Sequence, residues 1–114
     1  MLVLAIIVFV LAALLGLYLA SFILTNKNTP KGVALIHGGF ALLGVLLLIG
    51  YSLMYDTPVW ALVFFVLAAM GGAFMFYLDL TGKTIAKVLP LGHGLIAAIG
   101  LVLLILYVYQ GHSS

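Results

Sequence analysis

The chain has 114 residues, of which 68% are hydrophobic and only 5% are charged, and it contains no cysteine. A soluble domain needs a polar surface that this composition cannot supply, so a lipid bilayer is the solvent that suits the chain. The absence of cysteine excludes disulfides, thiolate metal sites and cysteine catalysis, and no residue pattern points to a nucleotide site, a hydrolase triad or nucleic-acid binding.

Four apolar segments follow one another along the chain, and each is long enough to span a bilayer. They cover about Leu2–Leu24, Gly32–Met54, Pro58–Leu78 and Val88–Tyr109. A hydrocarbon core of ~30 Å requires ~20 helical residues, and the alternating polar positions of a membrane barrel strand are missing. We therefore predict an all-α protein with four transmembrane helices in one membrane domain, residues 1–114.

The four lysines lie in two of the predicted loops. Lys27 and Lys31 follow the first apolar segment, and Lys83 and Lys87 follow the third. These two loops fall on the same side of the membrane, and the positive-inside rule places that side in the cytoplasm. We expect a multi-pass protein of a bacterial inner membrane with both termini periplasmic. Aromatic residues gather near the opposite end and are expected to form an interfacial belt: Tyr51, Tyr55, Trp60, Tyr107 and Tyr109.

The chain matches itself without a gap when it is shifted by 56 residues. Between residues 3 and 51, 21 of 49 positions are identical to their partners at 59–107. A shared apolar alphabet inflates that count, so the polar positions carry more weight, such as Leu24-Thr25-x-Lys27 against Leu80-Thr81-x-Lys83. Each copy, about 1–56 and 57–114, holds two helices, so both insert the same way. The predicted fold is an up-down four-helix bundle of two tandem, parallel-oriented hairpins.

One face of the second and fourth helices is conserved between the two copies. The shared residues lie at i, i+4, i+7, i+11 and i+14, which is one stripe of an α-helix. They are His37, Ala41, Gly44, Leu48 and Tyr51, repeated as His93, Ala97, Gly100, Leu104 and Tyr107. The first and third helices carry a similar stripe, made of Ala5, Phe9, Ala12 and Gly16 and repeated as Ala61, Phe65, Ala68 and Gly72. We predict that these stripes face inward; close packing alone is an alternative role for their small residues.

An ionisable residue inside a membrane helix suggests a functional site, although a histidine can also serve only to hydrogen-bond between helices. His37 and His93 are repeat partners and are expected at the same depth. A closed zinc or copper site wants three or four ligands, and neither Asp79 nor the methionines supply them in repeated positions. A haem needs two axial ligands, which two histidines provide across the ~13 Å diagonal of a four-helix bundle.

Small residues and lysines near the histidines fit a haem site. Gly38 and Gly94 follow the histidines, and the next two turns carry the other small residues of the stripe, Ala41, Ala97, Gly44 and Gly100. We expect them to let a porphyrin edge approach the backbone. Lys31 and Lys87 precede the histidines by six residues, ~9 Å toward the cytoplasm, where they could meet haem propionates; their alternative role is to orient the chain and attract anionic lipids.

A four-helix membrane bundle that carries two inward histidines with small residues around them resembles the membrane b-type cytochromes. Among these proteins, the chain resembles small bacterial four-helix membrane proteins with a Lys-x5-His-Gly-x2-Ala-x2-Gly segment, found here from Lys31 to Gly44 and from Lys87 to Gly100. The large cytochrome b families carry two histidine pairs. The resemblance therefore implies haem b, with its iron on His37 and His93, and one haem per chain in place of a transmembrane relay.

With both axial positions taken, one-electron transfer or haem handling is the expected role, and an electron carrier is favoured over an enzyme. Besides membrane lipids, a quinone or a redox protein is the expected partner, and histidines from two chains of a homodimer could share haems instead. The alternatives without a cofactor are a small transporter subunit and a structural accessory protein. His112, in the polar tail, has no repeat partner and is expected to be a solvated bystander.

Overall fold

A computed structural model of the chain describes residues 1–111, so that His112 lies outside the described residues. The fold consists of four α-helices: α1 (Leu2–Leu24), α2 (Lys31–Met54), α3 (Val59–Leu80) and α4 (Val88–Tyr109). These residues contain no strand, and the helix bounds agree with the predicted apolar segments to within two residues. All four helices are long and apolar enough to cross a membrane, which is consistent with a multi-pass membrane protein.

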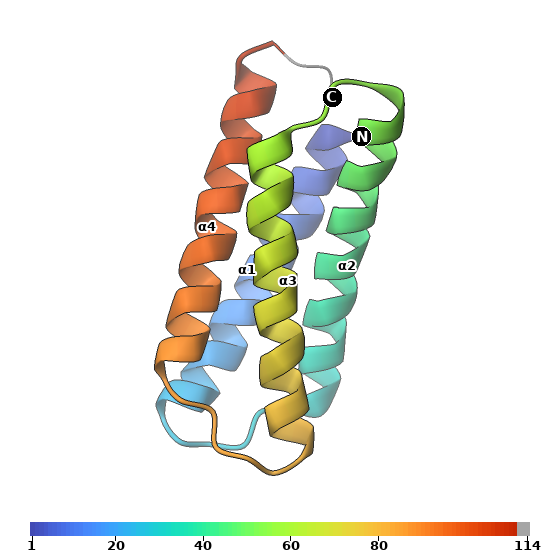
Figure 1. The fold of residues 1–114 in the computed structure, drawn as a ribbon. Coiled ribbons are helices and arrows are strands. Elements are labelled where there is room, and N and C mark those ends of the chain that lie inside the picture. Colours follow the sequence, from blue (N-terminus) through green and yellow to red (C-terminus); the bar gives the residue numbers. More distant parts are fainter. Residues whose placement is uncertain (112–114) are drawn as a thin grey trace.

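The helices form a bundle in which each packs against two others. α1 contacts α2 and α4, and α3 contacts the same two helices, so that α1 lies diagonally opposite α3 and α2 lies diagonally opposite α4. The loops that follow α1 and α3 lie at one end of the bundle, and the α2–α3 loop and the start of α1 lie at the other (Figure 1). All four lysines of the chain are therefore at one end, which we call the lysine end.

α1 and α3 end in the same way at the lysine end. The hydroxyls of Thr25 and Thr81 donate to the carbonyl four residues earlier, at 2.6 and 2.8 Å. The next residue adopts a left-handed conformation, with φ of 59° at Asn26 and 71° at Gly82. The amide of the following lysine then donates to the carbonyl five residues earlier, at 2.8 and 2.9 Å. The amide of the left-handed residue itself donates to the carbonyl three residues earlier, at 3.2 Å in both helices. These two backbone hydrogen bonds form a Schellman motif, so the Leu-Thr-x-Lys segment has the same structure in both copies.

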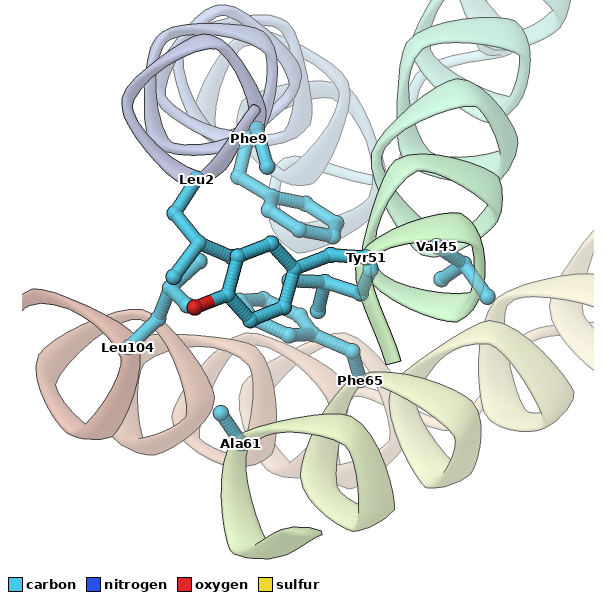
Figure 2. Close-up of a cluster of buried hydrophobic side chains, with 9 residues drawn as sticks. Leu2, Phe9, Val45, Tyr51, Ala61, Phe65 and Leu104 are labelled. Carbon is cyan, nitrogen blue, oxygen red and sulfur yellow. The ribbon is translucent and has the colours of Figure 1, made fainter. Parts of the chain in front are cut away.

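The main cluster of buried side chains lies away from the lysine end. One buried cluster draws on all four helices (Figure 2). Its members are Leu2, Ala5, Phe9, Val45, Leu48, Tyr51, Ala61, Phe65 and Leu104. The prediction that the stripes of α1 and α3 face inward is confirmed by the burial of Ala5, Phe9 and their counterparts. Large apolar side chains such as Leu17 and Leu53 are 70% and 82% exposed on the outside, where lipid would cover them; packing must then hold the helices together.

The expected aromatic belt is only partly present. Trp60 and Tyr109 remain on the surface, with 69% and 86% of their area exposed. The assignment of Tyr51 to the belt is wrong, because this side chain is 3% exposed and belongs to the buried cluster. Its place in the inward stripe of α2 is the prediction that the structure confirms. Tyr107 is partly buried, and its hydroxyl donates to the carbonyl of Asp56 at 3.0 Å, so it fastens α4 to the α2–α3 loop.

Candidate functional site

Two histidine side chains face each other inside the bundle. His37 comes from α2 and His93 from α4, the diagonal pair of helices that do not pack on each other within residues 1–111. The centroids of the two imidazole rings are 6.1 Å apart, and the ring planes make an angle of 80°. Both side chains are partly buried. The structure therefore brings together the two residues that the sequence singled out as ligands.

The ring of His37 packs against α1. Its Nδ1 atom lies 2.7 Å from the carbonyl oxygen of Ala12. The ring fits there because residue 16 is glycine: a Cβ atom on Gly16 would lie 2.9 Å from Cε1 of the imidazole. Since a carbonyl can only accept, Nδ1 carries the proton, and in the neutral ring Nε2 keeps its lone pair. A hydrogen bond of this kind orients and prepares a histidine for metal binding.

α3 seats the ring of His93 in the equivalent way, but the fit is looser. A Cβ atom on Gly72 would lie 3.1 Å from Cε1 of His93. The backbone of Ala68 faces the ring as that of Ala12 faces His37, yet the contact falls outside hydrogen-bond geometry. Nδ1 of His93 is consequently buried without a hydrogen-bond partner among the described residues. The two histidines thus share a setting and differ in one hydrogen bond.

A stacked pair of phenylalanine rings packs in the core next to the histidines. Phe9 and Phe65, from the diagonal helices α1 and α3, stack with ring centroids 3.7 Å apart and an interplanar angle of 1°. Gly44 and Gly100 are buried against them: a Cβ atom on Gly44 would lie 2.6 Å from the ring of Phe9, and one on Gly100 would lie 3.4 Å from the ring of Phe65. In this structure the two glycines make room for phenyl rings.

The remaining small residues of the predicted site lie on two different faces. Gly38 and Gly94 are exposed, and a Cβ atom on either would meet nothing within 4 Å, so they lie on the outer surface of the bundle. Ala41 and Ala97, one turn beyond the histidines on the inward stripe, are partly buried. The structure therefore keeps the alanines on the histidine face and turns the glycines that follow each histidine away from it.

The two predicted lysines differ in their surroundings. Nζ of Lys31 lies 2.8 Å from Oδ2 of Asp79 at the end of α3, and the hydroxyl of Thr29 donates to the same carboxylate oxygen. This cluster ties the α1–α2 loop to α3. Lys87 is exposed and stands as the residue before α4. The residue 56 positions before Asp79 is Ile23, so Lys87 has no carboxylate in the corresponding place.

Sequence reasoning did not connect Gly16 and Gly72 with the histidines. It placed both on the inward stripes, with close packing as an alternative role, whereas the structure places them directly against the imidazole rings. The available signal was the duplicated Ala-x3-Gly step, Ala12 to Gly16 and Ala68 to Gly72. The step alone does not show which residue of the next helix it meets, because that register depends on how the two helices of a hairpin pack.

Within residues 1–111, no group of three or more histidine, cysteine, aspartate or glutamate side chains could hold a metal ion. The site thus brings together two potential protein ligands, His37 and His93, whereas a closed structural zinc site uses four. In comparisons with known proteins, no family profile, curated protein or solved structure matches this chain.

Proposed function

We propose that the chain is an integral membrane haem b-binding protein in which His37 and His93 are the two axial ligands. The observation that carries the proposal is the facing pair of imidazoles from diagonal helices, with ring centroids 6.1 Å apart. Two metal–nitrogen bonds of ~2 Å, with ~1 Å from each nitrogen to its ring centre, separate two axial imidazoles by about 6 Å. The spacing thus suits two ligands on one iron within one chain.

The surroundings of the two rings support the same role. The hydrogen bond from Nδ1 of His37 to Ala12 leaves Nε2 for a metal. Gly16 and Gly72 carry no side chain beside the rings. Within residues 1–111, the buried side chains on the lysine side of the histidines are Leu19, Met75 and Pro90. This half therefore has fewer buried side chains than the cluster beyond the phenylalanine pair, and methionine adapts readily to a new neighbour.

Haem with two histidine ligands supplies one-electron redox chemistry, and its filled coordination disfavours reactions at the iron. The residues of this chain would hold and orient the group and exclude water from it. Lys87 is suitably charged for a propionate, whereas Lys31 would have to share its charge with Asp79. One-electron transfer or haem handling is therefore the function that these groups support best.

The arrangement in the membrane forms part of the proposal. Residues 56 positions apart make equivalent contacts at the helix ends and at both histidines, which supports two tandem hairpins in an up-down bundle. The lysine end would be cytoplasmic under the positive-inside rule, with both termini periplasmic in a bacterial inner membrane. Haem would then lie between the phenylalanine pair and the cytoplasmic surface.

Absorption spectra of the detergent-purified protein test the proposal. The oxidised and dithionite-reduced protein should show the sharp reduced α-band of low-spin haem b, and either His37→Ala or His93→Ala should abolish it. His112→Ala serves as the matched control and should leave the spectrum unchanged. A colourless protein that does not take up added haemin, or a band that survives both histidine substitutions, would overturn the proposal in favour of a transporter subunit or an accessory protein.

A further inference from the structure

An apolar groove of about 240 Å³ lies between α3 and α4, beside His93. Its lining includes Leu67, Gly71, Phe74, Gly92, His93 and Ile96. An apolar cavity of ~150 Å³ is large enough to hold benzene, so this groove has room for a substituted six-membered ring. It opens on the outer surface of the bundle, which a molecule dissolved in the lipid would reach directly.

The groove lies where the second half of the chain has glycines at two positions that hold large side chains in the first half. Gly71 and Gly92 both line it, and the residues 56 positions earlier are Leu15 and Ile36. A Cβ atom on Gly92 would meet nothing within 4 Å, and one on Gly71 would meet only Nδ1 of His93, at 3.9 Å. Packing inside the bundle therefore does not require glycine at either position.

One polar atom beside the groove lacks a partner. Nδ1 of His93 is buried and unpaired among the described residues, and it lies next to Gly71 on the groove wall. The equivalent atom of His37 is satisfied by the carbonyl of Ala12. An unpaired ring nitrogen in apolar surroundings is unfavourable. Because this nitrogen is buried and faces the backbone of Ala68, the imidazole would have to turn toward the groove for an acceptor there to take its hydrogen bond.

We propose that this groove binds the ring of a lipid-soluble quinone, one carbonyl oxygen of which accepts a hydrogen bond from Nδ1 of His93. The apolar lining disfavours charged molecules, and a plain hydrocarbon chain cannot satisfy the nitrogen. A quinone combines a flat ring, which Phe74 can contact, with carbonyl acceptors and a membrane-soluble tail. The redox meaning of this site rests on the proposed haem function, but the binding does not require haem.

Titration of the full-length protein in phosphatidylcholine nanodiscs tests the site. Decylubiquinone is added to protein with ¹⁵N-labelled histidine, with and without haem, and the ring-nitrogen resonances are followed. We expect a saturable shift of the His93 resonance, assigned by its loss in His93→Gln. Gly71→Leu and Gly92→Ile, which restore the residues of the first half, should each weaken binding at least tenfold. Gly94→Leu is the matched control on the outer surface and should bind as the wild type does.

Three results would overturn the proposal: no saturable shift in the wild type, equal affinity in Gly71→Leu and Gly94→Leu, or an equal shift with decylbenzene, which would make the groove a site for hydrocarbon chains. Circular dichroism of each variant shows whether the helices have formed. Because the titration is also run without haem, failure of the quinone site and failure of the haem proposal are separate results.

Discussion

Among the glycines of the described residues, Gly44 has the least room for a side chain, because Phe9 packs against it. A Cβ atom on Gly44 would lie 2.6 Å from both Cε1 and Cζ of the phenyl ring. The ring cannot move away freely, because Phe9 is 5% exposed and stacks on Phe65 with centroids 3.7 Å apart. Overpacking of this kind typically costs about 1–3 kcal/mol. We therefore expect Gly44→Ala to lower the free energy of unfolding by that amount.

Unfolding in mixed detergent micelles with increasing dodecyl sulfate, followed by far-ultraviolet circular dichroism, measures this change. Gly38→Ala is the matched control on the same helix, since a Cβ atom there meets nothing within 4 Å, and it should stay within about 0.5 kcal/mol of the wild type. The double variant Gly44→Ala/Phe9→Leu should show favourable coupling, because a smaller side chain relieves the clash. Equal stability of Gly44→Ala and Gly38→Ala would refute the reasoning.

Two further predictions concern the histidine seat and the lysine end. Gly16→Ala should push the imidazole of His37 off the Ala12 carbonyl, because the new Cβ atom would lie 2.9 Å from Cε1 of the ring. The haem content per chain, measured as the pyridine haemochrome, should therefore fall. An unchanged haem content would contradict the proposed role of Gly16 in placing the ring. Asp79→Asn should cost about 0.5–1 kcal/mol, because it breaks a partly exposed ion pair with Lys31. The same unfolding assay at low and high salt measures this loss, and a cost that does not shrink in high salt would argue against an ionic origin.

The two halves of the bundle share a scaffold and differ in what surrounds their histidines. His37 has its hydrogen bond to Ala12, whereas His93 has an unpaired nitrogen next to a groove. Lys31 of the first half is paired with Asp79 of the second half, whereas the reciprocal pair is missing because the counterpart of Asp79 is Ile23. These differences favour a site with two unlike sides, one sealed and one open to lipid.

The sequence by itself determined the helices. Composition and segment length predicted four membrane-spanning helices, with ends within two residues of those observed, because the length and hydrophobicity of a span are local properties that a bilayer fixes. The 3.6-residue periodicity likewise predicted the inward stripes, and burial of Gly44, Leu48 and Tyr51 agrees with it. The belt assignment failed at Tyr51 because aromatic composition does not say which side of a helix faces lipid.

Only the tertiary structure decided which stripes meet and at what register. Three contacts join residues from different helices: His37 packs against Gly16, Phe9 stacks on Phe65, and Lys31 forms an ion pair with Asp79. The sliding and rotation of one helix against another depend on the side chains of both, so no single segment encodes these contacts. The groove beside His93 is of the same kind, because glycines 21 residues apart in sequence, Gly71 and Gly92, form it only where α3 and α4 pack together.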